Sequence, residues 1–398
     1  MKQGWEYKKL GDICNVINGL WTGKKEPFIN VAVIRNTNFS KDCQLNLENV
    51  AYIDVEAKQF ASRKLLCGDI IIEKSGGSEK QPVGRPILFN ISDGDYSFSN
   101  FTSTLRIKEN AKVNSSFLHK CLYAFYLKGE TFKLQSKTTG LHNLNMKGYL
   151  RSTIPLPPKS IQLAIVSELD KINELIRLKK DQLKDYDNLA QSIFYEMFGD
   201  PVENEKGWEV TSLENVCSSI VRGPFGSALK KEFFVLPDDT NYKVYEQKHA
   251  IQKDANIGNY YVTVDKFKEL SRFEVKAGDI IMSCSGTIGE LFVIPSNAEK
   301  GLMNQALLKF TLNDYICKDY FLFLMESVKK NFTIRGTGLQ NIGSVKIIKV
   351  MKFGLPPLPL QHLFAQRIEQ IEHQKSEVTK VITDLKTLLA SRMQHWFE

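Results

Sequence analysis

Three short stretches in the first half of the chain carry polar side chains that can bond to the base edges and phosphates of a DNA duplex. Each stretch has a counterpart of similar character in the second half. Arg can contact two acceptors of guanine at once, Asn and Gln can pair with adenine, and Ser, Thr and Lys suit phosphate oxygens. The candidates in the first half are Arg35, Asn36, Asn38, Lys74, Ser75, Lys80, Lys137, Thr138, Thr139, His142 and Asn143, and those in the second half are Lys243, Gln247, Lys248, Ser283, Ser285, Thr287, Arg335, Thr337, Gln340 and Asn341.

These residues also have an ordinary structural interpretation, because Ser, Thr and Asn commonly cap turns. The distribution of net charge along the chain is a separate indication of a phosphate-binding surface. Residues 1–159 hold 23 Lys and Arg against 14 Asp and Glu, a net charge of +9, whereas residues 200–358 have a net charge of only +1. A basic surface is what phosphate binding requires, although a solvated basic face would give the same count. No regular aromatic series of the kind that stacks single-stranded bases is present, so duplex DNA is favoured.

Catalytic motifs are nearly missing from the sequence. It contains no Walker-type loop, Gly-x-Ser-x-Gly, His-Glu-x-x-His or Gly-x-Gly-x-x-Gly, and no Asp-Pro-Pro-Tyr segment of the adenine-methyltransferase kind. The seven Cys form no Cys-x-x-Cys pair, so we expect neither a disulfide framework nor a zinc site. One pattern, Asp238 followed by Glu246 and Lys248, resembles a metal-dependent nuclease core, but its spacing is short and the first half lacks it. We therefore expect a chain that is not an enzyme and holds no metal or cofactor.

The positions of the candidates follow from an internal duplication with a spacing near 200 residues. Four landmarks recur in the same order, with offsets that vary as loop insertions would make them vary. They are Gly4-Trp5-Glu6 with Gly207-Trp208-Glu209, Gly68-Asp69-Ile70-Ile71 with Gly278-Asp279-Ile280-Ile281, Thr139-Gly140-Leu141 with Thr337-Gly338-Leu339, and Leu156-Pro157-Pro158 with Leu355-Pro356-Pro357. The duplication predicts two similar domains.

A segment free of glycine and proline follows each Leu-Pro-Pro sequence, over residues 161–198 and 360–397. Apolar residues recur there at alternating spacings of four and three, which is typical of a coiled-coil seam. The seam residues are Ile165, Leu169, Ile172, Ile176, Leu183 and Ile193 in the first segment, and Phe364, Ile368, Ile371, Val378, Ile382, Leu385 and Leu389 in the second. We expect the two helices to pair antiparallel as a spacer and docking surface, with homodimerisation through the same seams as the alternative.

Within each half, short apolar runs alternate with turns and one helical pattern. Strands are predicted at 28–34, 69–73 and 101–107 in the first half and at 243–245, 279–283 and 306–310 in the second, with helices at 117–127 and 319–328. The expected fold class is α+β, with two tandem mixed α/β domains separated by two long helices that form an antiparallel coiled coil. The predicted boundaries are 1–160 and 200–359 for the domains and 161–199 and 360–398 for the helices.

The doubled features together resemble the specificity subunits of type I restriction-modification systems along nearly the whole chain. The resemblance rests on the paired Gly-Trp starts, the paired Gly-Asp-Ile-Ile segments, and the paired Leu-Pro-Pro sequences followed by Ile161-Gln162 and Leu360-Gln361. It implies that each domain is a target-recognition domain for one half of a split DNA site, and that the helix pair sets the gap between the halves.

The same resemblance implies the partners and cofactors of the complex. Two DNA adenine methyltransferase subunits would dock on the helices and flip the target adenine for S-adenosylmethionine-dependent methylation, and a restriction and translocase subunit using ATP and Mg²⁺ would join them. None of these cofactors would be bound by this chain, for which we expect a cytoplasmic location. The alternatives are a recognition subunit for a solitary or type II-like methyltransferase or nuclease, and a helix-paired scaffold without DNA affinity.

Overall fold

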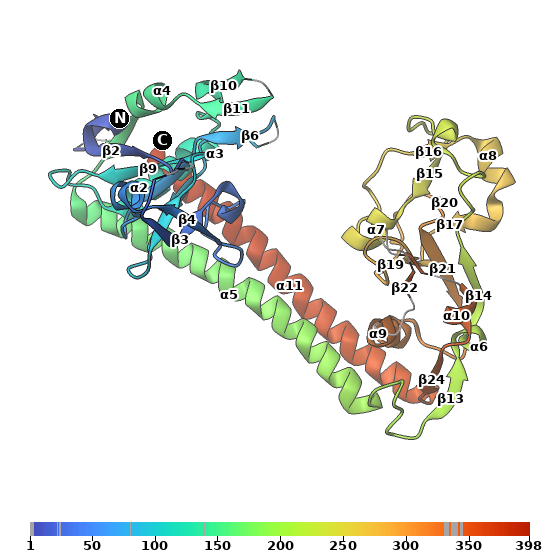
Figure 1. Ribbon diagram of the computed structural model, residues 1–398. Helices are drawn as coiled ribbons and strands as arrows, with labels where there is room; N and C mark the ends of the chain where they lie inside the picture. Colours follow the sequence, from blue (N-terminus) through green and yellow to red (C-terminus); the bar gives the residue numbers. More distant parts are fainter. Residues whose placement is uncertain are drawn as a thin grey trace. The chain divides into compact units, whose positions relative to one another are not determined.

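The computed structural model describes residues 4–21, 23, 25–79, 81–138, 140–329, 334–335, 341–342 and 345–398. The chain divides into two compact units, and the first unit is discontinuous in sequence (Figure 1). It comprises Met1–Lys180 together with Lys380–Glu398, whereas the second is Asp181–Thr379. The C-terminal end of the chain therefore belongs to the same unit as the N-terminal domain.

The first unit contains twelve strands in the described residues, and its central sheet is antiparallel. The strands are β1 (Glu6–Lys9), β2 (Cys14–Asn18), β3 (Phe28–Ile34), β4 (Ala51–Glu56), β5 (Ile70–Glu73), β6 (Ser75–Gly77), β7 (Pro86–Leu88), β8 (Tyr96–Phe98), β9 (Thr102–Ile107), β10 (Gln135–Thr138), β11 (Leu141–Leu144) and β12 (Thr153–Leu156). They form sheets of order β2-β9-β5-β7, β4-β3-β8 and β10-β11-β6, and a ribbon of β1 with β12. The helical segments are α1 (Leu10–Ile13), η1 (Asn36–Asn38), α2 (Ala57–Arg63), α3 (Ser115–Leu127), η2 (Phe132–Leu134) and α4 (Met146–Arg151).

The second unit repeats this plan with its own strands. They are β13 (Glu209–Ser212), β14 (Cys217–Arg222), β15 (Tyr242–Tyr245), β16 (Tyr261–Val262), β17 (Glu274–Val275), β18 (Ile280–Ser283), β19 (Leu291–Val293), β20 (Gly301–Met303), β21 (Leu307–Leu312), β22 (Ile334–Arg335), β23 (Asn341–Ile342) and β24 (Lys352–Leu355). The sheets are β14-β21-β18-β19, β16-β15-β20-β17, β22-β23 and β13-β24. The helical segments are α6 (Leu213–Val216), η3 (Lys231–Phe233), α7 (Gln247–Gln252), α8 (Val264–Glu269), η4 (Ser271–Phe273), α9 (Lys318–Val328) and α10 (Val345–Lys349).

The six strands and two helices expected from the sequence agree with observed elements to within two residues at each end. Several short helices add to the single helical patch that was expected in each half. One of them, α7, begins at Gln247 where a loop was predicted. It forms because the Glu246 amide donates to Nδ1 of His249, 2.8 Å away, and so fixes the first turn.

The central strands β5 and β18 form the core of each unit. Ile70, Ile71 and Ile72 are fully buried, and Ile280 to Met282 are nearly so. A continuous apolar run is typical of a strand covered on both faces, and each such side chain contributes about 1.5–3 kcal/mol by burial. The Gly-Asp-Ile-Ile motif thus fixes the strand from which the polar loop of each unit emerges.

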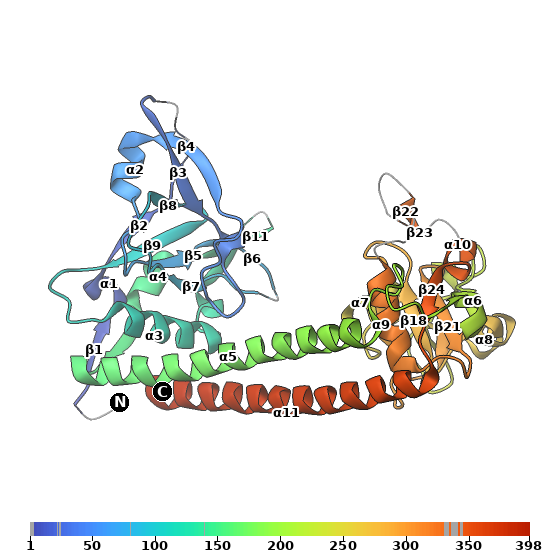
Figure 2. The same cartoon turned by 90° about the horizontal axis from the view of Figure 1, so that it is seen from below.

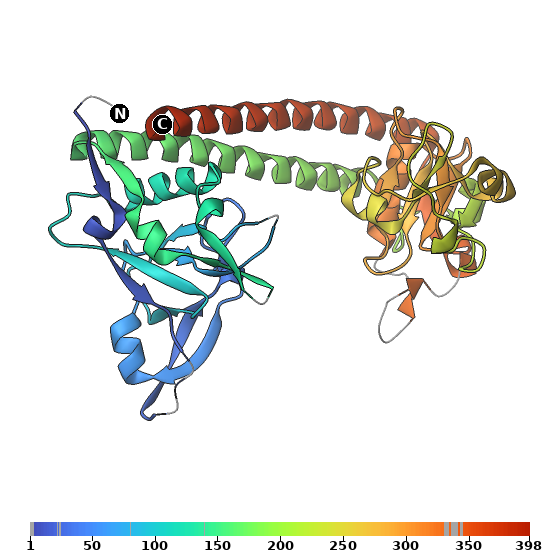
Figure 3. The same ribbon diagram turned by 90° about the horizontal axis from the view of Figure 1, so that it is seen from above.

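Two 40-residue helices, α5 (Lys159–Phe198) and α11 (Leu358–Phe397), confirm the predicted long segments. In the first unit, Ile165 and Leu169 near the start of α5 share a cluster with Met393 near the end of α11. In the second, Phe198 near the end of α5 lies 5.4 Å from Phe364 near the start of α11. The helices are therefore antiparallel, as expected, and Figures 2 and 3 both show them side by side.

Most of the predicted seam residues are buried, and those that are less buried lie toward the C-terminal end of each helix. Ile165, Leu169, Ile172, Ile176, Phe364, Ile368, Ile371, Val378 and Ile382 are buried, whereas Leu183, Ile193, Leu385 and Leu389 are half-buried. At the end of α5 the buried residues are Ala190, Phe194 and Phe198, spaced by four. The spacing changes because Phe194 also packs on α9, 5.6 Å from the Tyr320 ring.

Each long helix is joined to its domain by an equivalent buried glutamine. Gln162 Oε1 accepts from the Asn114 amide at 2.8 Å, and its Nε2 donates to the Pro157 carbonyl at 2.8 Å. Gln361 makes the same two bonds, to the Cys317 amide and the Pro356 carbonyl, both at 2.8 Å. This explains the paired Leu-Pro-Pro and Gln motifs, because the amide joins the helix start to the residue that precedes α3 or α9.

No helix among the described residues combines the length and apolar character needed to cross a membrane.

Candidate DNA interface

The polar stretches of the first unit meet at one end of the central sheet. The last residue of β5, Glu73, pairs with Thr102 at the start of β9. The last residue of β3, Ile34, accepts a hydrogen bond at 2.9 Å from the amide of Ser99, which lies just before β9. Arg35 and Lys74 therefore follow the last residues of strands in two different sheets, and the segment from Ser99 to Thr102 joins these strand ends.

Side-chain hydrogen bonds then connect all three stretches. Asn36 Nδ2 donates to the Ser75 carbonyl at 2.6 Å, and Ser75 Oγ donates to Asn143 Oδ1 at 2.6 Å. The amide of Leu144 also donates to the Lys74 carbonyl at 2.8 Å. Figure 1 shows the resulting arrangement, in which β11 lies between β10 and β6. Segments more than 100 residues apart thus form one polar surface.

The second unit has the same geometry with other side chains. The amide of Ile342 donates to the Cys284 carbonyl at 3.0 Å, which is the counterpart of the bond between Leu144 and Lys74. Arg222, which sequence reasoning missed, donates from Nη1 to the Ile342 carbonyl at 3.1 Å and so holds β23 against the end of β18. The sequence could have indicated Arg222 as a candidate, since it is a basic residue at the end of a strand.

At both surfaces a glycine lets an amide side chain approach the backbone closely. Gly76 has a φ of +102°, and a Cβ there would lie 3.1 Å from Nδ2 of Asn36. Gly286 has a φ of +67°, and a Cβ there would lie 3.6 Å from Nε2 of Gln247. The positive φ angles favour glycine at both positions. The amide of Asn36 or Gln247 is thereby placed over the segment that follows the central strand.

Most of the remaining candidates reach solvent. Arg35 and Thr287 are exposed, whereas Asn36, Lys74, Ser75, Asn143, Gln247, Lys248 and Ser285 are half-buried. Burial lowers the pKa of Lys74 below the ordinary value of a lysine. Lys248 pairs with Glu246 and lies 5.3 Å from the centre of the Tyr260 ring. In the first unit the surface therefore presents a guanidinium, an ammonium and amides, which are groups suited to base and phosphate contacts.

Four candidates are buried, which is a correction to the expectation of a DNA contact. Asn38, 1% exposed, accepts from the Arg35 amide and donates to the Asn46 carbonyl. Ser283, fully buried, donates to the Thr287 carbonyl. Lys243 is 2% exposed and its ammonium lies 3.5 Å from Glu299, and His142 is 9% exposed. Such side chains shape the loops and strands from within, because a group without exposed surface cannot meet a duplex.

Four other candidates, Lys80, Thr139, Thr337 and Gln340, lie outside the described residues. For Lys137, Thr138, Arg335 and Asn341 only the backbone is described, in β10, β22 and β23. Their predicted role in DNA contact stays a prediction.

A buried ion pair supports the surface of the first unit from behind. The Arg85 guanidinium donates to both carboxylate oxygens of Glu73, at 2.7 and 3.0 Å, and to the Phe39 carbonyl at 3.0 Å. Both side chains are less than 10% exposed. Arg85 was missed by sequence reasoning because only the fold brings it to the end of β5. In the second unit the equivalent positions are Ser283 and Glu290.

The nuclease-like residues do not form a metal site in the structure. Asp238 Oδ1 accepts from the amide and hydroxyl of Thr240, at 3.0 and 3.1 Å, while Glu246 pairs with Lys248. Across the described part of the chain, no group of three His, Cys, Asp and Glu residues is placed to hold a metal ion.

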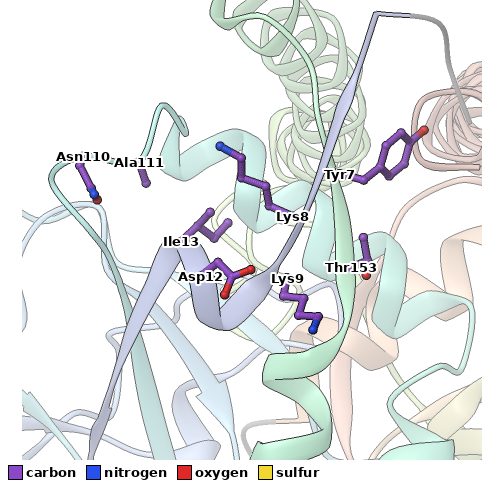
Figure 4. Close-up of a pocket in the computed structure, with 8 residues that line it drawn as sticks. All are labelled: Tyr7, Lys8, Lys9, Asp12, Ile13, Asn110, Ala111 and Thr153. Atoms are coloured by element: carbon purple, nitrogen blue, oxygen red, sulfur yellow. The ribbon is translucent and has the colours of Figure 1, made fainter.

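A pocket of about 500 Å³ lies elsewhere in the first unit (Figure 4). It is lined by Tyr7, Lys8, Lys9, Asp12, Ile13, Asn110, Ala111 and Thr153. These residues surround the start of β2 and the end of β9, which is the end of the central sheet opposite to the polar surface. The pocket is therefore separate from the candidate interface.

Comparisons with known proteins agree with the duplicated plan. A protein of Methanocaldococcus jannaschii named as the MjaX type I restriction enzyme specificity subunit is 21% identical over 379 residues, which are 93% of this chain and 87% of that protein. The MjaVIII specificity subunit of the same organism is 25% identical over 167 residues, 38% of each chain.

Among solved structures, one described as the structural basis of complex assembly and conformational transition of the type I R-M system has a similar fold. It matches with a TM-score of 0.64 and 16% identity, over 99% of this chain and 97% of that one. The model of the type I restriction modification DNA specificity domain matches twice, over residues 2–185 and 205–386. Because these two matches cover most of both halves, the chain belongs to the family of type I restriction-modification DNA specificity proteins.

Proposed function

We propose that this chain is the non-catalytic specificity subunit of a type I restriction-modification complex and that each unit reads one half of a split duplex site through the polar surface described above. The observation that carries the assignment of the surface is its repetition. In both units an amide side chain, of Asn36 or Gln247, lies against a glycine of positive φ in the segment that follows the central strand. The recurrence of an amide side chain at the same place in both copies supports a shared role for the two surfaces.

The chemistry of the two surfaces suits different half-sites. The first offers Arg35, which can pair with guanine, beside an Asn36 amide that is held by the Ser75 carbonyl, and the second offers Glu246 with Gln247 at the equivalent positions. A carboxylate accepts a hydrogen bond from cytosine, so a change from Arg to Glu changes the base that is preferred. The two halves of the site should therefore differ in sequence.

The antiparallel helices would fix the unread gap. A 40-residue helix is about 60 Å long at about 1.5 Å per residue, more than one turn of duplex DNA. The buried Gln162 and Gln361 attach each domain to its helix by the same bonds, so the gap should be constant.

The catalytic activities of the complex would be supplied by partner subunits. DNA adenine methyltransferase subunits, two per complex, would dock along α5 and α11 and supply S-adenosylmethionine-dependent methylation. A restriction and translocase subunit would supply ATP- and Mg²⁺-dependent translocation and cleavage, and the assembly would act in the cytoplasm. The chain itself would contribute DNA reading and spacing.

Mapping of methylated adenine tests the proposal. The chain is co-expressed with the methyltransferase encoded beside it in a host that lacks adenine methylation, and N6-methyladenine is located across the genome. We expect a single two-part motif with a fixed gap, and a host carrying the methyltransferase alone serves as the control. An unsplit motif would favour a solitary or type II-like system, and absence of methylation together with absence of DNA binding would favour a scaffold.

A further inference from the structure

One aromatic side chain is exposed at an equivalent place in each unit. Trp21 follows β2 and is 63% exposed, and Phe225 follows β14 and is 83% exposed. Aromatic side chains carry large apolar surfaces and are usually mostly buried. An exposed ring in both copies, where neighbouring side chains have diverged, points to a shared role.

A glycine two residues earlier establishes that the positions are equivalent. A Cβ on Gly19 would lie 1.8 Å from the Ser99 carbonyl oxygen, and one on Gly223 would lie 1.9 Å from that of Asn304. Both contacts are with backbone, so only hydrogen fits at either glycine. The two glycines thus hold the following residues against the loop that precedes β9 or β21.

That loop also forms part of the candidate DNA interface. In the first unit, Ser99 donates to the Ile34 carbonyl at 2.9 Å, just before Arg35, and the amide of Ser75 donates to the Phe101 carbonyl at 3.0 Å. In the second, the amide of Asn304 donates to Tyr245 at 2.9 Å and that of Cys284 donates to Ala306 at 2.7 Å. The backbone before each aromatic residue is therefore attached directly to the readout loops.

Cationic groups lie beside both aromatic segments. The Nε of Arg63 donates to the carbonyl of Asn18 at 3.1 Å, directly before Gly19. Arg222 directly precedes Gly223 and bonds to the Gln305 carbonyl at 3.2 Å. A single exposed ring flanked by guanidinium groups suits a polyanion with stacked apolar bases better than it suits the apolar surface of a protein.

We propose that Trp21 and Phe225 are DNA-contacting wedges, each inserting its ring at a base step of the half-site read by its own unit. The inference rests on the proposed function and adds to it a second kind of contact. The wedge unstacks the step and lets the duplex bend toward the polar loops, at a cost that depends on how readily that step deforms. Each half-site would then be selected partly by a step that no polar side chain reads.

Binding of defined duplexes by the complex with the methyltransferase subunits tests the wedges. The probe is a duplex with the split motif found by methylation mapping, and duplexes with one scrambled half serve for comparison. We expect Trp21→Ala and Phe225→Ala each to weaken binding about tenfold, the size of one lost stacking contact. Trp21→Phe should retain affinity within about threefold, because a ring remains. Scrambling the first half should abolish the effect of Trp21→Ala and leave that of Phe225→Ala.

Tyr315→Ala is the matched control, since Tyr315 is 67% exposed and follows the other end of β21. It should leave affinity unchanged. If the wild-type complex does not bind the split duplex, the proposed function fails. If it binds and both alanine variants bind equally well, only the wedge inference is overturned.

Tryptophan fluorescence gives a second readout. Of the four Trp residues, Trp21 is exposed whereas Trp5, Trp208 and Trp396 are half-buried. Stacking on bases should quench the emission of Trp21, so the quench produced by the duplex should be larger for the wild-type complex than for Trp21→Phe. An equal quench in the two complexes would contradict insertion of Trp21.

Discussion

The two units share a framework and differ in the side chains that the framework presents. Both have the strand order of the central sheet, a glycine of positive φ after the central strand, and a buried glutamine at the start of the long helix. At the presenting end, Arg35, Lys74 and the Glu73–Arg85 pair of the first unit correspond to Glu246, Cys284 and the Ser283–Glu290 positions of the second. The backbone and the buried packing positions of the site are thus the same in both units, whereas the side chains that it presents differ.

The largest effect should come from breaking the ion pair that only the first unit has. Arg85→Met leaves the Glu73 carboxylate buried without its partner, which typically costs about 3–5 kcal/mol. Glu290→Gln is the matched change, and it should cost less than about 1 kcal/mol because the lysines that pair with Glu290 are partly exposed. Chemical unfolding of the full chain measures both. Equal losses of unfolding free energy in the two variants would contradict the proposal that only the first unit depends on a buried ion pair.

Acid should destabilise both units through buried histidines. Burial lowers the pKa of His119 to about 4 from its usual 6.5. The pKa of His249 is also lowered, and burial is the main cause. Because the unfolded chain takes up the proton first, stability falls as pH falls from about 6.5 to about 4, by as much as about 3 kcal/mol for His119. The unfolding free energy of His119→Gln, measured against pH, should fall less over this range than that of the wild type. Parallel pH profiles would refute the assignment.

Substitution of the two buried glutamines, Gln162 and Gln361, should lower the stability of the two units by the same amount. Gln162→Leu and Gln361→Leu each leave a buried amide and carbonyl without partners, and we expect a loss of about 2 kcal/mol from either. Gln366→Leu, on an exposed face of α11, is the control and should be nearly neutral. Thermal unfolding compares the three variants, and a loss confined to one of the buried positions would break the equivalence.

The smallest expected effect is the most specific. Arg35→Ala should relax selection at the first half-site and leave the second unchanged, and Gln247→Ala should do the reverse, each by about 1–2 kcal/mol, or about tenfold. Competition binding with duplexes altered in one half measures the change. Loss of selection at both halves, or at neither, would remove these residues from the readout surface.

Sequence patterns predicted the framework well because they reflect local rules. The runs around Ile71 and Ile281 predicted the central strands, and the seam from Ile165 to Ile176 predicted the paired helices. The site depended on contacts that the sequence does not display. Ser75 and Asn143 meet only in the fold, and Asn38, Lys243 and Ser283 have suitable side chains but are buried. At the end of α5, Phe194 is buried in place of Ile193 because packing on α9 competes with the heptad seam.

If each unit reads its own half of one split site, the two halves of the site should be exchangeable one at a time. The most direct test exchanges residues 1–159 for the corresponding segment of another family member and maps N6-methyladenine in the host with the same methyltransferase. We expect one half of the methylated motif to change while the other half and the gap are retained. A motif that changes in both halves, or that does not change, would contradict it.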